Sequence, residues 1–315
     1  MPVVRAVLRR ALQILANGQP NAHPQEWTML TVQLLAHCLE WPPERVWTAP
    51  QQRVPADRVR RFYRMVRLWA RGMPIQYLLG RWGFWNLRDL RTPPGVAIPR
   101  PATETLMTAV AARFPDATVP LRILDLGTGT GALAIALAVV YPRATVWAVD
   151  ISTRAVQVAR INAHRFHVAD RVHIWQGDWL RAVRVGPFWD VVVCNPPYLT
   201  RRAWRAAPVS VRDFEPPEAF VSPGGPAHVY TTIGRQVRSR LRANGILFVE
   251  VGDRQAAHVR RWMERLGAVC VQTWRDVQGQ IRCLAFRWPT DDRSAEPRDP
   301  EDGPSVFADR PVRQE

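Results

Sequence analysis

From residue 121 onward, short apolar segments typical of strands alternate with segments of helical periodicity. The predicted strands are residues 122–125, 145–150, 172–176, 190–194 and 246–251, and the predicted helices between and after them are 131–140, 153–164, 228–241 and 255–266. Such alternation predicts an α/β fold with a mostly parallel sheet and helices on both of its faces. Residues 269–274 and 281–287 then follow as two strands without an intervening helix. We expect the last strand to be antiparallel, because so short a connection cannot form a parallel crossover.

A glycine-rich turn follows the first of these strands, which ends in Asp125. The turn consists of Gly127, Thr128, Gly129, Thr130 and Gly131. Glycines let a backbone turn sharply and approach a ligand without a Cβ clash. Asp150 ends the next strand, where its carboxylate can accept both hydroxyls of a ribose. A dinucleotide, with its pyrophosphate on the helix N-terminus, and S-adenosylmethionine both suit this arrangement, so the turn alone does not separate them.

A second motif, Asn195-Pro196-Pro197-Tyr198, follows the strand at 190–194 and therefore lies at the carboxyl edge of the sheet, where α/β enzymes bind ligands. The two prolines fix the backbone and remove two N–H donors. The groups that remain are acceptors, namely the side-chain oxygen of Asn195 and the carbonyl of Pro196. Two converging acceptors suit an NH2 group, and Tyr198 supplies an aromatic face for a flat amide or base.

This pocket chemistry predicts methyl transfer to a planar nitrogen. An amide nitrogen is a poor nucleophile because its lone pair is delocalised. Hydrogen bonds from its N–H groups to acceptors raise the electron density on the nitrogen. Catalysis can then rest on alignment and electrostatics without a strong general base. Asp178 and Trp179, after the strand at 172–176, could bind an adenine through a carboxylate and a ring, although a surface turn is an equal alternative.

Residues 1–72 form a separate helical region, with apolar periodicity at 3–16, 25–39 and 56–69 and prolines between these segments. This pattern predicts a small N-terminal bundle. Residues 73–99 then read as a linker with a β-hairpin within 77–98, and residues 100–288 as the α/β domain. Residues 289–315 are rich in charge and proline, which predicts a disordered tail.

The formal net charge is +16, and all of the basic residues are arginines. Such a charge favours acidic partners, but a solvated basic surface explains it equally well. The same alternatives apply to one stripe of the third helix, formed by Arg60, Arg64, Arg67 and Arg71. The cysteines and histidines lack the spacing of metal ligands, so we expect no metal. No apolar run could cross a bilayer and no signal peptide is evident, so we expect a cytoplasmic protein.

These motifs together resemble the glutamine methyltransferases that modify peptide chain release factors. The resemblance covers about residues 72–287, with a weaker helical match before it. Besides the glycine-rich turn and residues 195–198, it includes the segments 80–85, 98–104 and 213–216. The segment Ile98-Pro99-Arg100-Pro101-Ala102-Thr103-Glu104 is specific to this family. The family usually has an acidic residue where this chain has Ala102.

The resemblance implies a Rossmann-like fold of S-adenosylmethionine-dependent methyltransferases. It implies cofactor contacts at residues 127–131, Asp150, Trp179 and Asn195, to which we add Asp178. It further implies that residues 195–198 hold the glutamine of a Gly-Gly-Gln loop, with Asn195, Pro196 and Tyr198 as the catalytic set. The N-terminal bundle would dock the body of the release factor, and we expect the enzyme to be a monomer.

Three alternatives remain open at this point. A relative that acts on a glutamine of a ribosomal protein would have nearly the same pocket. A nucleic-acid adenine methyltransferase would suit the charge, but it must extract its base and usually carries a target-recognition region. Residues 1–72 contain no evident nucleic-acid motif, so direct nucleic-acid binding is not required. A non-catalytic binding module is disfavoured because the turn, Asp150 and Asn195 are all intact.

Overall fold

The computed structural model of the chain describes residues 1–18 and 24–289. The described residues form two compact units. The first comprises residues 1–82, 92–94 and 207–215, and the second comprises residues 83–91, 95–206 and those from 216 onward. The tail expected at 289–315 lies outside the described residues except for residue 289.

The first unit is built on a helical bundle with a hydrophobic core of its own. Its helices are α1 (Val4–Gly18), α2 (Pro24–Leu39), α3 (Pro43–Thr48), α4 (Ala56–Ala70) and α5 (Ile75–Leu79). In α1 the buried residues recur every three or four positions, at Val4, Val7, Ala11 and Leu15. The three long helices agree with the predicted segments. Helices α3 and α5 were not predicted, because the prolines around them read as loop signals although proline is favoured in a first helical turn.

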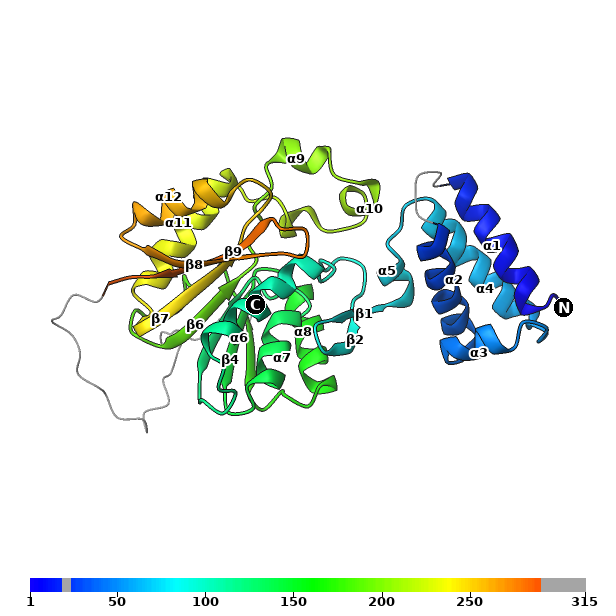
Figure 1. The fold of residues 1–315 in the computed structure, drawn as a ribbon, viewed down its shortest axis with the longest axis horizontal. Helices are drawn as coiled ribbons and strands as arrows, with labels where there is room; N and C mark the ends of the chain where they lie inside the picture. Colours follow the sequence, from blue (N-terminus) through cyan, green and yellow to red (C-terminus); the bar gives the residue numbers. More distant parts are fainter. Residues whose placement is uncertain (19–23, 290–315) are drawn as a thin grey trace, which may run out of the picture. The chain divides into compact units, whose positions relative to one another are not determined.

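The second unit contains a seven-stranded sheet with the order β5-β4-β3-β6-β7-β9-β8 (Figure 1). The strands are β3 (Arg122–Leu126), β4 (Thr145–Asp150), β5 (Val172–Gln176), β6 (Trp189–Cys194), β7 (Leu241–Glu250), β8 (Val269–Arg275) and β9 (Ile281–Arg287). Strands β3 to β7 pair in parallel, whereas β9 is antiparallel to both of its neighbours. The predicted mostly parallel sheet with an antiparallel last strand is therefore confirmed.

Helices cover both faces of this sheet, as predicted. Alternate residues of each strand enter different cores, so that Val191 belongs to one and Val192 to the other. The first core includes α6 (Glu104–Arg113), α7 (Ala132–Val140) and α8 (Thr153–Arg165), and the second includes α11 (Gly225–Arg238) and α12 (Ala256–Glu264). Helix α6 was missed because its buried residues include consecutive positions, which gives no single apolar stripe.

The predicted hairpin is present as a two-stranded sheet of β1 (Arg81–Phe84) and β2 (Leu87–Arg91). Trp85, in the turn of this hairpin, has a φ of 51° and is 42% exposed. The hairpin lies inside the predicted range, and residues 75–79 before it form helix α5. The short helices α9 (Arg201–Arg205) and α10 (Val209–Arg212) follow residues 195–198, and α10 belongs to the first unit.

Candidate functional site

The glycine-rich turn between β3 and α7 needs glycine for two different reasons. Gly127, Gly129 and Gly131 all have positive φ, at 76°, 57° and 82°. A Cβ on Gly131 would lie 3.0 Å from the Ile135 side chain and 3.1 Å from that of Ala159, so this position also requires close packing. A Cβ on Gly129 would meet nothing within 4 Å. The turn therefore packs tightly at its helical end and faces open space at Gly129.

Two carboxylates, the buried Asp125 and the half-buried Asp150, hold this turn in place. Asp150 accepts hydrogen bonds from the backbone N–H groups of Gly129 (2.8 Å, to Oδ2) and Ser152 (2.9 Å, to Oδ1). Asp125, which is 2% exposed, accepts one from the Thr128 hydroxyl at 2.7 Å. Burial raises the pKa of Asp150, and it raises the pKa of Asp125 to about 7. The predicted ribose contact of Asp150 would use the lone pairs that these bonds leave over.

Trp179 and Asn195 lie at the same turn although they are distant in the sequence. A Cβ on Gly127 would lie 3.8 Å from the Trp179 ring and 3.9 Å from the Asn195 carbonyl oxygen. Trp179 adopts a left-handed backbone, with a φ of 52°. Asp178 forms an exposed ion pair with Arg181 at 3.1 Å. The structure thus brings three predicted segments together, and the adenine contact of Asp178 stays a prediction.

The side-chain amide of Asn195 is oriented by Thr103. Asn195 Nδ2 donates a hydrogen bond to Thr103 Oγ1 at 2.9 Å, so the amide oxygen is left as the acceptor. Pro196, which follows, is buried. An acceptor rather than a donor thus remains on the Asn195 side chain, and its contact with an incoming NH2 group stays a prediction.

Tyr198 is held at both of its ends. Its hydroxyl donates to Glu250 Oε1 at 3.2 Å, and its backbone carbonyl accepts from Gln255 Nε2 at 3.1 Å. Burial raises the pKa of Tyr198 far above its usual range, with Glu250 as the next cause. Tyr198 therefore offers a neutral aromatic face and does not act as a base near neutral pH.

Sequence reasoning did not assign a role to Glu250, which ends β7 and is 1% exposed. Burial raises its pKa to about 7, and the hydroxyls of Thr103 and Tyr198 and the charges of Arg282 and Arg100 lower it. A signal was present in the sequence, because Glu250 ends an apolar strand just as Asp150 does.

The segment at 98–104 makes a separate contact through each of its polar residues. Thr103 accepts from Asn195, Glu104 Oε1 accepts from the backbone N–H of Trp85 at 2.8 Å, and the Arg100 guanidinium lies 5.7 Å from the centre of the Phe220 ring. Ala102, where the resemblance leads one to expect an acid, is half-buried. The segment thus links the hairpin turn to the residues that follow β6.

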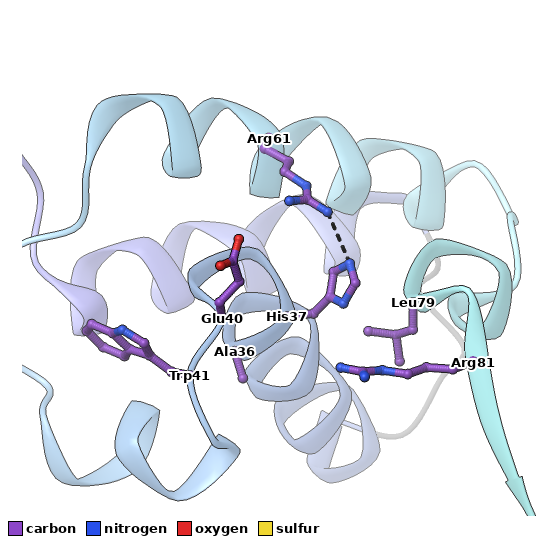
Figure 2. Close-up of a pocket in the computed structure, with 7 residues that line it drawn as sticks. All are labelled: Ala36, His37, Glu40, Trp41, Arg61, Leu79 and Arg81. Carbon is purple, nitrogen blue, oxygen red and sulfur yellow. Dashed lines mark hydrogen bonds between the residues drawn. The ribbon is translucent and has the colours of Figure 1, made fainter. Parts of the chain in front are cut away.

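A hollow in the first unit, about 470 Å³ in volume, lies between α2, α4 and the start of β1 (Figure 2). Arg61 and His37 point toward each other across it, with Arg61 Nη2 donating to His37 Nε2 at 3.2 Å. Burial and the neighbouring Arg61 and Arg81 lower the pKa of His37. All four residues of the predicted arginine stripe (Arg60, Arg64, Arg67 and Arg71) are exposed.

Two absences apply to the part of the chain that the structure describes. Residues 1–18 and 24–289 contain no group of three or more His, Cys, Asp or Glu side chains placed to hold a metal ion. Within the same ranges, no helix has the length and apolar character to cross a membrane.

Two protein-family models match the chain. The methyltransferase small domain matches residues 100–225, and the PrmC N-terminal domain matches residues 6–80. The first match covers the glycine-rich turn and residues 195–198, and the second covers the helical bundle.

Curated relatives match over most of the chain. It is 35% identical to a release factor glutamine methyltransferase of Xylella fastidiosa, over 81% of this chain and 91% of that protein. It is 32% identical to a release factor glutamine methyltransferase of Aliivibrio fischeri, over 91% of this chain and 98% of that protein. A third relative of the same name, from Salmonella typhimurium, is 41% identical over 69% of this chain and 76% of that protein.

Solved structures show the same fold at low identity. The hMettl16 catalytic domain in complex with a MAT2A 3'UTR hairpin superposes with a TM-score of 0.52 at 16% identity, over 64% of this chain and 76% of that one. A second complex of that domain gives a TM-score of 0.51 at 14% identity, over 82% of this chain and 92% of that one.

Proposed function

We propose, because this chain belongs to the release factor glutamine methyltransferase family, that it methylates the side-chain amide nitrogen of the glutamine in the Gly-Gly-Gln motif of peptide chain release factors. The chain is a methyltransferase that uses S-adenosylmethionine. One observation carries the substrate chemistry: the bond from Asn195 to Thr103 leaves the Asn195 oxygen free to accept from an amide NH2.

The proposed catalytic set consists of Asn195, Pro196 and Tyr198. These residues orient the substrate amide and do not remove a proton from it. Asn195 Oδ1 and the Pro196 carbonyl each accept a hydrogen bond from one N–H of the glutamine NH2, and the rings of Pro197 and Tyr198 confine its plane. These two hydrogen bonds raise electron density on nitrogen and fix the direction of its lone pair. Tyr198 stays protonated, so the amide proton leaves to solvent after the nitrogen has been alkylated.

S-adenosylmethionine, when bound, supplies a methyl group on a positively charged sulfur, which makes the carbon electrophilic. The residues at the carboxyl edge of the sheet fit this molecule, since Gly127 lies between the Trp179 ring and the Asn195 backbone and Gly129 borders open space. We assign the cofactor to Gly127, Thr128, Gly129, Thr130, Gly131, Asp150, Asp178, Trp179 and Asn195. Asp150 would bind the ribose and Trp179 would pack on the adenine.

The first unit is the proposed docking domain for the body of the release factor. Its exposed arginine stripe and the hollow at Arg61 and Arg81 suit an acidic protein surface. A monomer in the cytoplasm suffices for this reaction, because its substrate is a translation factor and each chain carries its own site. Neither membrane nor direct nucleic-acid binding is needed.

The test incubates the full chain and methyl-labelled cofactor with release factor, ribosomal proteins or duplex DNA in separate reactions. Label should enter the release factor, and replacing the glutamine of its Gly-Gly-Gln motif with alanine should prevent this. Label on a ribosomal protein alone, or on DNA alone, would assign the chain to one of the alternative substrates.

A further inference from the structure

The connection between β5 and β6 carries Trp179 and contains no helix. It consists of residues 177–188, all of which the structure describes. Connections between parallel strands of one sheet are usually α-helical, and a helix pairs its own backbone N–H and C=O groups. In this connection those groups need partners elsewhere in the fold, because buried ones are rarely left unpaired. Whatever supplies these partners therefore also holds Trp179.

The backbone of Trp179 adopts a conformation that needs support. Its φ of 52° lies in the left-handed region, which is unfavourable for a residue with a Cβ. Such conformations persist where the surrounding contacts over-determine them. The peptide N–H that follows Trp179 belongs to Leu180, and it donates to Gln236 Oε1, in helix α11, at 2.8 Å. This bond fixes the peptide plane after Trp179 and so helps to place the ring beside Gly127.

The guanidinium of Arg240, in the turn between α11 and β7, binds the same connection through its carbonyls. Nη2 donates to the carbonyl oxygens of Val183 at 2.6 Å and Leu180 at 3.3 Å. Nε donates to the carbonyl oxygen of Arg184 at 3.1 Å. Nη1 donates to the carbonyl oxygen of Gln236 at 2.8 Å, so one group ties the connection to the end of α11.

The position of Arg240 is unfavourable for a cation. The residue is 8% exposed, and every hydrogen bond that it donates within the described residues goes to an uncharged oxygen. Burying a charge with uncharged acceptors alone opposes folding, although the C-terminal end of the α11 dipole offsets part of this cost. A methionine would fill the space without the charge, so packing does not account for an arginine here. The planar fork does, because it can hold three carbonyls of a helix-free segment at once.

We propose that Arg240 and Gln236 are positioning residues, which hold residues 178–184 so that the Trp179 ring is ready to pack on the adenine of S-adenosylmethionine. They act through Trp179 and are not themselves cofactor contacts. Without them the chain after Trp179 can rotate, and part of the binding free energy of the cofactor is used to order the connection. The inference rests on the proposed adenine contact of Trp179, and it does not depend on the methyl acceptor.

Arg171 offers a matched control elsewhere in the same sheet. Its Nη1 also donates to three backbone carbonyls, those of Ala138 at 3.0 Å, Ala144 at 3.3 Å and Tyr141 at 3.4 Å. Arg171 immediately precedes β5, at the amino edge of the parallel strands, whereas the glycine-rich turn lies at the carboxyl edge. Replacing Arg171 should therefore remove a carbonyl-binding arginine of the same kind and spare the cofactor site.

The test measures the affinity of the full chain for S-adenosylhomocysteine by calorimetry, which needs no methyl acceptor. The dissociation constant should rise about tenfold in Arg240→Met and in Gln236→Met, as it does when only about a tenth of the molecules are competent to bind. Gln236→Glu keeps an acceptor for the Leu180 N–H and should retain parental affinity. Arg171→Met should also bind within about twofold of the parental chain. Parental affinity in a folded Arg240→Met or Gln236→Met, or an equal loss in Arg171→Met, would overturn the proposal.

A double variant tests whether Arg240 acts through Trp179. Trp179→Ala removes the ring itself, so adding Arg240→Met to it should cause no further loss of affinity. Losses that multiply would show that Arg240 affects the cofactor by another route, and the positioning role would be wrong. Parental affinity in Trp179→Ala would remove both the proposed adenine contact and the positioning role.

Steady-state kinetics separates this role from a general loss of structure and from the choice of methyl acceptor. In Arg240→Met the KM for S-adenosylmethionine should rise about tenfold, while kcat at saturating cofactor stays within about twofold of the parental value. A fall in kcat with an unchanged KM would contradict the proposal. If the parental chain methylates no release factor but its affinity for S-adenosylhomocysteine depends on Arg240, the substrate assignment fails and the positioning role stands.

Discussion

Asn195 and Thr103, which are 92 positions apart in the sequence, are joined by a side-chain hydrogen bond of 2.9 Å. One belongs to the loop after β6 and the other to the short turn before α6. An asparagine side chain has donors on its nitrogen and an acceptor on its oxygen. The bond fixes the orientation of the Asn195 amide, so that its oxygen is the group available to a ligand. It also explains why the motif at 98–104 accompanies the motif at 195–198.

Replacing Asn195 with alanine should abolish methyl transfer and preserve the fold. The change removes one of the two acceptors for the substrate NH2, and the loss of such a preorganised group costs about 100-fold or more in rate. Transfer of label to release factor is the measurement, and an unchanged circular dichroism spectrum is the control. Transfer at the parental rate would show that Asn195 has no such role.

Replacing Asp150 with alanine should weaken the binding of S-adenosylmethionine by about tenfold or more. The change removes the proposed ribose contact and leaves the N–H groups of Gly129 and Ser152 without their acceptor. Calorimetric titration with the cofactor measures the effect. Asp150→Asn keeps one acceptor oxygen and should lose less, whereas an unchanged affinity in the alanine variant would contradict the ribose contact.

Gly129→Ala and Gly279→Ala form a matched pair. Both glycines have positive φ, at 57° and 80°, and in both a Cβ would meet nothing within 4 Å. Each substitution should lower the free energy of unfolding by about 1 kcal/mol, from backbone strain alone. Only Gly129→Ala should weaken cofactor binding, since only that space is proposed to hold the cofactor. Equal affinities in the two variants would place the cofactor elsewhere.

Glu250→Gln should stabilise the protein at alkaline pH. Burial raises the pKa of Glu250 from 4.5 to about 7, so ionisation opposes folding. This destabilisation is absent below the unfolded pKa, grows as the pH rises to about 7 and is constant above it. The variant should gain up to about 3 kcal/mol of unfolding free energy at pH 8 and almost nothing at pH 4, as measured by urea denaturation. A gain that did not change with pH would argue against a buried ionised carboxylate.

Two C-terminal truncations should show where the folded core ends and the tail begins. Trp288 is buried, and its indole N–H donates to the Leu266 carbonyl at 3.0 Å. A chain ending at residue 289 should keep parental activity and thermal stability. A chain ending at residue 287 loses this side chain and should lose about 3 kcal/mol of unfolding free energy. A large loss of activity in the longer chain would show that residues 290–315 take part in function.

Local patterns in the sequence were sufficient to predict the type of fold and most of the candidate site. The strand–helix alternation predicted the parallel sheet, and the prolines of residues 195–198 indicated a set of acceptors, because these properties depend on neighbouring residues. Helix α6 was beyond such reasoning, since it is buried on more than one side and shows no single stripe. Helices α3 and α5 were also missed, because proline marks a loop and a helix start equally well.

Tertiary structure alone decided which distant residues surround Asn195. The insertion of β9 between β7 and β8 places Arg282 near Glu250, and the parallel register of β6 and β7 places Glu250 near Asn195. Thr103 arrives from a segment that precedes the whole sheet. No local pattern encodes these proximities, because they follow from how strands are ordered and aligned. The sequence by itself determined the chemistry available at the edge of the sheet, and the packing of the strands determined which of those groups meet.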